Sequence, residues 1–224
     1  MRPVLDPTLY LVTDTKLCRP RPVADVVRAA VAGGVTAVQV RDKHASRREL
    51  LALTRSVQAA LVDRPDVAVV VNDAVDVALL AGVDGIHVGQ EDLPVLEVRA
   101  LIGPECHLGL SVSSTADLDA ALSLPPGTVD LVGVSPVWGT PTKPDAGPGL
   151  GLPATAGLAA AGRTGGLSVV AIGGIDARSA AAVAATGVDG LCVVSAICAS
   201  PDPTSAAREL RSEIRRGRLA EVGR

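Results

Sequence analysis

Short apolar runs alternate along this chain with longer segments whose apolar residues recur at helical spacing. The runs are rich in Val, Leu and Ile and end in Gly, Asp or other polar residues, a pattern that is typical of buried strands. This pattern predicts strands at residues 9–12, 37–40, 68–71, 85–88, 108–110, 131–134, 169–172 and 191–194.

The intervening segments each present an apolar face and predict helices. They lie at residues 23–32, 47–62, 74–81, 94–101, 114–121, 153–161, 177–185 and 204–216. Regular alternation of strand and helix indicates a parallel sheet with helical crossovers. Eight repeats match the closure of a single (β/α)8 TIM barrel, an α/β fold; an open doubly wound sheet has the same local signals and is the alternative.

Helix-capping and turn residues stand at these predicted boundaries. Ser46, Ser114 and Asp176 stand where helix N-caps are expected. Glycine-containing turns after the helices ending near residues 32, 81 and 185 are typical of C-terminal caps that lead into the next strand. We therefore interpret these turns as structure at the bottom of the barrel and not as functional motifs.

The 224 residues suit one barrel domain spanning 1–224, because no Gly/Ser-rich linker divides the chain. The C-terminal helix is expected at about 204–216, followed by a short basic tail. The long irregular segment is 135–153, which is rich in Pro and Gly. Segments of that length in compact domains are usually binding loops.

Composition narrows the class of protein. The net charge is −3 and aromatic residues are only 1% of the chain, which disfavours binding to nucleic acid or to an acidic membrane. The four cysteines lie far apart, without metal-binding or redox spacing, as in a reducing compartment. No long apolar stretch indicates a signal peptide or a membrane span. A cytoplasmic protein that binds small molecules is expected, and a homo-oligomer is compatible with the sequence.

Polar side chains follow the apolar runs, and a barrel brings these ends to one rim. Gln39, Arg41 and Lys43 alternate after the second run, so in an extended segment they point the same way. A surface strand with charged ends is the simpler interpretation of this motif alone. Together with the later motifs, it predicts a pocket for phosphorylated substrates.

Asp73 and Asp92 follow the third and fourth runs. Carboxylates from neighbouring strand ends can share a hard cation such as Mg²⁺, which takes oxygen ligands. The alternative is that each aspartate caps the helix that follows it.

The remaining motifs suit phosphate. Thr140, Thr142 and Lys143 lie on the proline-rich loop, while Gly173-Gly174 and Val194-Ser195 follow the last two runs, where this fold commonly binds phosphate. His87 lies inside the fourth run, and we interpret it as a structural histidine. No Ser/His/Asp or Cys/His arrangement predicts a protein nucleophile.

Taken in order, these motifs resemble thiamine phosphate synthases across nearly the whole chain. The stretches that carry the resemblance are YLVTD (10–14), VQVRDK (38–43), VNDAVDVALLAGVDGIHVGQEDLP (71–94), GLSVS (109–113), GVSPVWGTPTKPDA (133–146), AIGGI (171–175) and GVDGLCVVSAI (187–197). The resemblance implies a barrel transferase of thiamine diphosphate biosynthesis. Such an enzyme condenses 4-amino-2-methyl-5-pyrimidinylmethyl diphosphate with a (carboxy)thiazole phosphate, by a dissociative, Mg²⁺-assisted substitution that releases diphosphate.

The resemblance also implies residue roles. The pyrimidine diphosphate site would comprise Gln39, Arg41, Lys43, Asn72, Ser111 and Lys143. The thiazole phosphate site would comprise Thr140, Thr142, Gly174, Val194 and Ser195. The Mg²⁺ ligands would be Asp73 and Asp92, and the catalytic groups Arg41, Ser111 and Lys143.

One departure bears on the alternatives. The family often has Ser-Val-His where this chain has Ser111-Val112-Ser113. A histidine in this region is implicated in proton transfer by related thiazole tautomerases, so its replacement disfavours that activity and leaves synthase chemistry intact. A tautomerase and a non-catalytic regulatory relative on the same barrel remain the alternatives.

Overall fold

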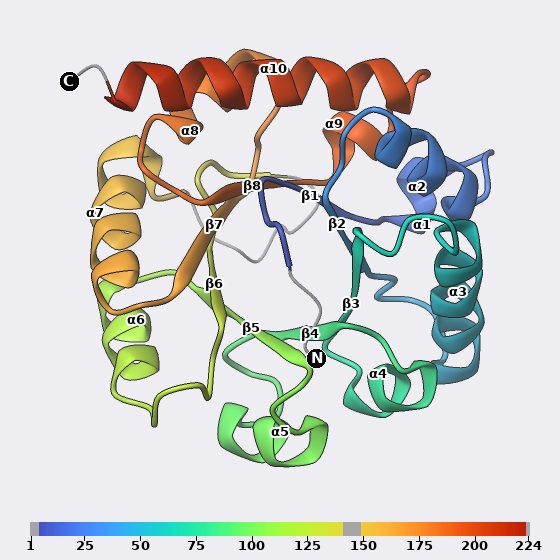
Figure 1. The fold of residues 1–224 in the computed structure, drawn as a ribbon, viewed down its shortest axis with the longest axis horizontal. Helices are drawn as coiled ribbons and strands as arrows, with labels where there is room; N and C mark the ends of the chain where they lie inside the picture. The colour runs from blue at the N-terminus through green and yellow to red at the C-terminus, as the bar shows by residue number, and fades with distance from the viewer. Residues whose placement is uncertain (1–4, 141–148, 223–224) are drawn as a thin grey trace.

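The strands form a closed parallel barrel, in which each strand pairs with its neighbours in chain order and β8 pairs with β1 (Figure 1). The structure is a computed structural model that describes residues 5–140 and 149–222. Its strands are β1 (Leu9–Val12), β2 (Ala37–Val40), β3 (Ala68–Asn72), β4 (Gly85–Val88), β5 (His107–Val112), β6 (Leu131–Val134), β7 (Ser168–Ile172) and β8 (Gly190–Val193).

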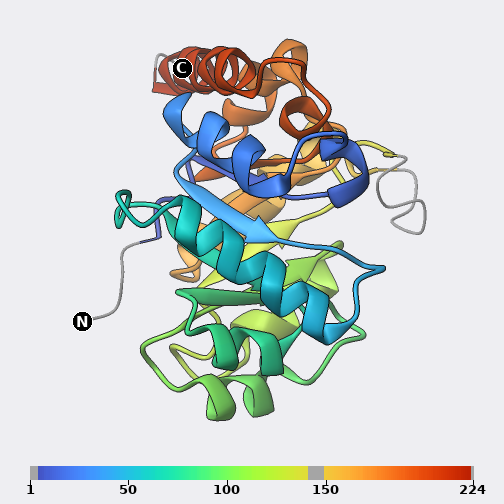
Figure 2. The same ribbon diagram turned by 90° about the vertical axis from the view of Figure 1, so that its right-hand side faces the viewer.

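Helices surround the strands on the outside (Figures 1 and 2). They are α1 (Thr15–Cys18), α2 (Val23–Ala32), α3 (Arg47–Ala60), α4 (Val75–Ala81), α5 (Val95–Ile102), α6 (Thr115–Leu122), α7 (Gly151–Thr164), α8 (Ala177–Ala184), α9 (Ser195–Cys198) and α10 (Pro203–Val222). The predicted TIM barrel is confirmed, and the open doubly wound sheet is wrong because β1 and β8 are hydrogen-bonded neighbours. The short helices α1 and α9 were not predicted.

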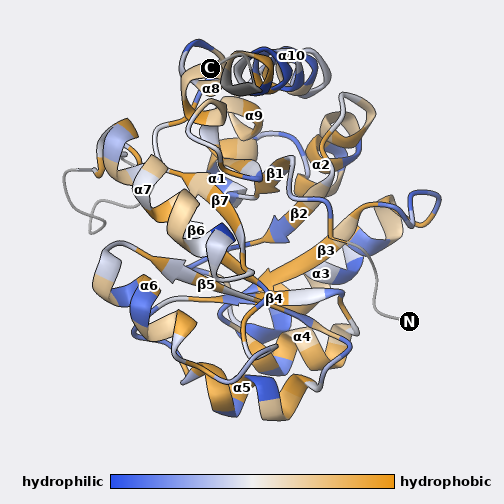
Figure 3. Cartoon of the chain, turned by 60° about the vertical axis from the view of Figure 1, so that its left-hand side comes forward, coloured by the Kyte–Doolittle hydropathy of each residue, from blue (hydrophilic) through white to orange (hydrophobic). Residues whose placement is uncertain are grey.

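Burial separates two apolar layers. One lies between the strands and the helices and contains residues such as Leu11, Val38 and Val132. The other fills the barrel interior and contains Tyr10, Val70, Leu131, Val170 and Cys192. Neighbouring strand residues face opposite layers, so strands buried on both faces are continuously apolar. In Figure 3, strands such as β3 are largely apolar in colour, whereas the helices are mixed.

Helix α10 is longer than the predicted 204–216 segment and lies across α8 and α2 (Figure 1). The contact is close because Gly217 leaves no room for a side chain: a Cβ there would lie 2.2 Å from the carbonyl oxygen of Ala181. Among the described helices, none combines the length and apolar character needed to cross a membrane.

At the bottom of the barrel, the same side-chain-to-backbone hydrogen bond recurs before every second strand. Thr36, Asp84, Asp130 and Asp189 immediately precede β2, β4, β6 and β8. Their side-chain oxygens accept from the peptide N–H groups of Leu9, Val69, Leu108 and Val169, respectively, at 2.7–3.0 Å. Each N–H lies in the first or second residue of the preceding strand, so a buried donor at each strand start is satisfied.

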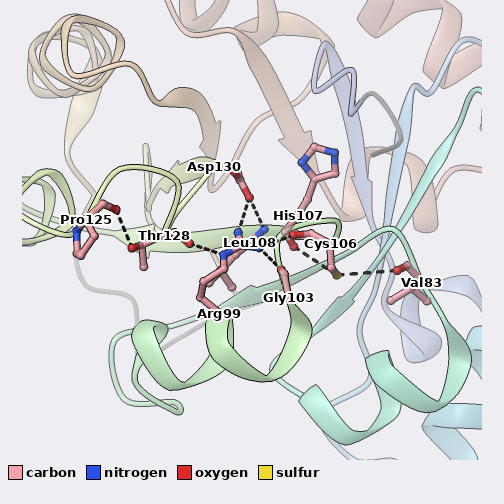
Figure 4. A network of polar contacts seen from close by, with 9 residues as sticks. All are labelled: Val83, Arg99, Gly103, Cys106, His107, Leu108, Pro125, Thr128 and Asp130. Atoms are coloured by element: carbon pink, nitrogen blue, oxygen red, sulfur yellow. Dashed lines mark hydrogen bonds and ion pairs between the residues drawn. The ribbon is translucent and has the colours of Figure 1, made fainter. Parts of the chain in front are cut away.

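The Asp130 site extends into a larger network around Arg99 of α5 (Figure 4). The guanidinium donates to Asp130 at 2.7 Å and to the carbonyl oxygens of Gly103, Cys106 and Thr128 at 2.7–3.0 Å. The side chains of Arg99 and Asp130 are only 15% and 17% exposed. Arg99 therefore ties α5 to the loops that precede β5 and β6.

We predict that Arg99→Met lowers the free energy of unfolding by about 3–5 kcal/mol, because it leaves a mostly buried carboxylate without its cation. Chemical denaturation followed by circular dichroism measures the effect. The matched control is Arg64→Met, whose pair with Asp66 is far more exposed and should contribute about 0–1 kcal/mol. Equal losses in the two variants would contradict the role given to Arg99.

Candidate active site

The carboxyl ends of the strands open into a pocket of about 520 Å³. It is lined by every predicted site residue that belongs to the described part of the chain. These are Gln39, Arg41, Lys43, Asn72, Asp73, Asp92, Ser111, Thr140, Gly174, Val194 and Ser195. Thr142 and Lys143 lie outside the described residues. The structure thus brings together side chains from β2 through β8, while their individual roles stay predictions.

Gln39 forms part of the pocket floor. It is 5% exposed, and its Nε2 donates to the Tyr10 hydroxyl at 3.4 Å. Burial raises the pKa of Tyr10 far above its usual value, so this hydroxyl stays protonated. Arg41 is half-buried and Lys43 is exposed, so polarity and exposure increase together from the floor to the rim.

Asp73 and Asp92 lie side by side as a hydrogen-bonded pair of carboxyl groups. The pKa of Asp73 rises to about 6, first because of burial and then because of its hydrogen bond to Asp92 and that group's negative charge. The positive charge of Lys43 partly opposes this rise. Asp73 also has a left-handed backbone (φ 60°), which is uncommon outside glycine and costs conformational energy.

Neither aspartate caps the helix that follows it, so the alternative interpretation of both is wrong. The N-cap of α4 is Ala74 and that of α5 is Pro94, and neither cap makes a side-chain hydrogen bond. Asp92 instead accepts from the peptide N–H of Gly89 at 2.7 Å. Within the described ranges 5–140 and 149–222, no group of three or more His, Cys, Asp or Glu side chains is placed to hold a metal ion. A pair of carboxylates suits Mg²⁺, which usually keeps waters and binds substrate phosphate.

His87 also lines the pocket, and its interpretation as a structural histidine stays a prediction. Its Nε2 lies 3.0 Å from the Ser111 Oγ, and both residues line the pocket. The imidazole fills space left by glycines on the next two strands: a Cβ at Gly109 would lie 2.3 Å from its Nδ1, and one at Gly133 would lie 3.1 Å from its Cε1. His87 is in register with Gly109 of the adjacent strand, a pairing that only the folded sheet reveals.

Two further side chains around Ser111 were not predicted. Gln90 donates from Nε2 to the Ser111 carbonyl oxygen at 2.7 Å, which fixes the backbone of β5 at the rim. Ser113 stands at the position where the resembled family often has a histidine, and its hydroxyl donates to the Asp117 carboxylate at 2.8 Å. That hydrogen bond holds the Ser113 side chain against the first turn of α6.

The opposite side of the pocket is built from β6, β7 and β8. The chain after β6 pairs with the end of β7, since Val137 and Trp138 donate to the carbonyl oxygens of Ile172 and Gly173. Gly173 and Gly174 have φ of 114° and 65°, a conformation that glycine adopts without strain and that lets a backbone approach a ligand closely. Val194 and Ser195 continue this wall at the start of α9.

Known proteins share this sequence and architecture. A family model described as thiamine monophosphate synthase matches residues 9–197. A thiamine-phosphate synthase of Laribacter hongkongensis is 46% identical over 94% of this chain and 96% of its own length. One from Albidiferax ferrireducens is 45% identical over 92% of this chain and 91% of its own. The solved thiamine phosphate pyrophosphorylase from Pyrococcus furiosus superposes with a TM-score of 0.82 at 34% identity, over 96% of this chain and 98% of the other.

We predict that Gly109→Ala displaces the His87 imidazole, because the added methyl would lie 2.3 Å from Nδ1. Overpacking of this kind lowers the free energy of unfolding by about 1–3 kcal/mol. Urea unfolding and the imidazole NMR signals of His87 measure the two effects. Gly157→Ala is the control: nothing lies within 4 Å of its Cβ, so replacing this helical glycine should stabilise by about 0.5–1 kcal/mol. An unchanged His87 signal in Gly109→Ala would contradict the packing described above.

Proposed function

Because the chain belongs to the thiamine monophosphate synthase family, we propose that it joins 4-amino-2-methyl-5-pyrimidinylmethyl diphosphate to a thiazole phosphate, which gives thiamine phosphate and diphosphate. Family membership confirms the prediction of this family and of a transferase. The observation that carries the proposal for this chain is a pocket in which two hydrogen-bonded carboxyl groups lie beside cationic side chains. Asp73 and Asp92 would hold a divalent cation there, which would neutralise the charge of a diphosphate substrate.

The pyrimidine diphosphate is assigned to the side of the pocket formed by β2 to β5. Gln39 and Ser111 offer neutral hydrogen-bonding groups at its floor and wall, suited to a heterocycle with an amino group. Arg41 and Lys43 provide positive charge nearer the rim, suited to the diphosphate, since an arginine guanidinium binds phosphate oxygens in pairs. Asn72, at the end of β3, completes this assignment.

Asp73 and Asp92 are assigned as ligands of Mg²⁺. The raised pKa of Asp73 supports the fit, because two close carboxylates resist ionisation together and a cation between them removes that cost. When bound, Mg²⁺ would neutralise the diphosphate leaving group. The positive charge of Lys43 acts on Asp73, so Lys43 would contribute positive charge on the protein side.

The reaction breaks the bond between the pyrimidine methylene carbon and the diphosphate oxygen, whose electron pair leaves with diphosphate. The aminopyrimidine ring delocalises the positive charge that develops on the methylene, and the thiazole nitrogen then supplies the electron pair of the new C–N bond. The protein needs no nucleophile of its own. Its residues orient the two substrates and stabilise the departing charge, chiefly through Arg41 and Lys43.

The thiazole phosphate is assigned to the opposite side of the pocket, to Thr140, Gly174, Val194 and Ser195. Peptide N–H groups in glycine turns bind phosphate in many barrels of this type. Val170 and Ile172 also line the pocket, and their apolar side chains would help to shield the cationic intermediate from water. Thr142 and Lys143 stay predictions from the sequence resemblance.

The alternatives make different predictions. A tautomerase would need a proton-transfer residue near position 113, where the hydroxyl of Ser113 is bound to Asp117. A regulatory relative would bind ligands without turnover. Purified protein mixed with both substrates and Mg²⁺ should release diphosphate and form thiamine phosphate in equal amounts. Binding without either product would overturn the proposal.

We predict that Asp92→Asn lowers kcat/KM at fixed Mg²⁺ at least about 100-fold, because loss of even an outer partner of a metal ligand commonly costs 10–100-fold. Asp73→Asn should act similarly. Steady-state kinetics at several Mg²⁺ concentrations measure both the rate and the apparent affinity for the metal. The control is Asp76→Asn, which removes an exposed α4 carboxylate paired with Arg47 and should leave the kinetics unchanged. Full activity of Asp92→Asn at low Mg²⁺ would refute its assignment as a ligand.

A further inference from the structure

Thr13 makes an unusual pair of contacts just beyond the end of β1. It is 0% exposed. Its hydroxyl accepts from the peptide N–H of Arg41 at 3.0 Å and donates to the carbonyl oxygen of the same residue at 3.3 Å. Its own peptide N–H donates to the carbonyl oxygen of Gln39 at 2.9 Å. One threonine therefore engages the backbone of two residues assigned to the pyrimidine diphosphate site.

These contacts continue the barrel ladder past its last strand pair. Strand β2 ends at Val40, and the last β1–β2 partners are Val12 and Gln39. Arg41 lies beyond that register. The Thr13 hydroxyl bonds the peptide N–H and the carbonyl oxygen of Arg41 in place of a neighbouring strand. Both backbone polar groups of Arg41 are thereby hydrogen-bonded to one buried side chain.

The segment that follows Thr13 is held in place by a helix cap. The next residue, Asp14, is the N-cap of α1 and accepts from the peptide N–H groups of Lys16 and Leu17 at 3.0 Å. Thr13 thus lies between a strand ladder and a capped helix, so its hydroxyl has a fixed position from which to orient Arg41.

We propose that Thr13 is a positioning residue of the active site, which sets the backbone of Arg41 and thereby the place of the guanidinium group that binds diphosphate. This inference rests on the proposed function, because it gives Arg41 its ligand. A long arginine side chain has many rotamers, so fixing its base restricts where its charge can lie. Displacement of a binding group by about 1 Å commonly costs as much as 100-fold in rate.

The chain offers a matched control. Thr54 is also 0% exposed, but its hydroxyl donates to the carbonyl oxygen of Leu50 within α3, at 2.8 Å. Thr54→Val removes a buried hydroxyl as Thr13→Val does, and it leaves Arg41 untouched. A purely structural role for Thr13 would make the two variants alike.

The experiment compares wild type with Thr13→Val, Thr13→Ser and Thr54→Val. The probe is inorganic diphosphate with Mg²⁺, titrated by calorimetry, together with the KM values for the two substrates. Thr13→Val should weaken diphosphate binding about 10- to 100-fold and raise KM for the pyrimidine diphosphate, with KM for the thiazole phosphate unchanged. Thr13→Ser should stay within about threefold of wild type, because the hydroxyl and both of its hydrogen bonds remain.

A double-mutant cycle identifies the route of the effect. If Thr13 acts through the guanidinium, Thr13→Val should add nothing to diphosphate binding in an Arg41→Ala background beyond what Thr54→Val adds. Equal diphosphate binding by Thr13→Val and Thr54→Val, or equal rises of both KM values, overturns the inference. If Thr13→Val does not fold, Thr13→Ala undergoes the same comparison. Absence of turnover in wild type would instead count against the proposed function, since binding of diphosphate is measured without it.

Discussion

Closure of the parallel hydrogen-bond ladder is the constraint on which the rest of this structure depends. The ring closes where β8 pairs with β1. There Gly190 lies so close to the segment before β1 that a Cβ would be 1.7 Å from the carbonyl oxygen of Pro7. A side chain there would open the seam. Because the ring is closed and every strand is parallel, all strand ends reach one rim. Residues as distant in sequence as Gln39 and Ser195 therefore line one pocket.

The two ends of the barrel use aspartate for opposite purposes. At the bottom, Asp84, Asp130 and Asp189 accept from strand N–H groups, which satisfies backbone donors at the strand starts. At the top, Asp73 lies beside Asp92, and its pKa is raised. The bottom carboxylates satisfy backbone donors of the fold, whereas the top pair carries an electrostatic cost that, under the proposed function, a bound cation would offset. This division follows the general separation of stability and function between the two faces of such barrels.

The sequence predicted what depends on local pattern and missed what depends on register. The strand boundaries at Leu9–Val12, Ala37–Val40 and Leu131–Val134 agree with the structure, because buried runs bounded by turn residues are local signals. Helices α1 and α9 have only four residues each, too few to show a helical period. The roles of His87 and Thr13 depend on partners in neighbouring strands, Gly109 and Arg41, and no spacing within one strand reveals such a pairing.

Strand β2 shows how one element changes from core to active site. Ala37 lies in the interior apolar cluster, Gln39 is buried above it, and Arg41 is half-buried near the rim. These alternate residues share the interior face, so charge appears only where water can reach it, which limits the cost of burying an ion. Under the proposed function, the heterocycle would lie at the apolar end of this gradient and the diphosphate at its charged end. Bond cleavage would then move negative charge toward solvent and cations and leave the positive intermediate against neutral side chains, with water kept from its methylene carbon.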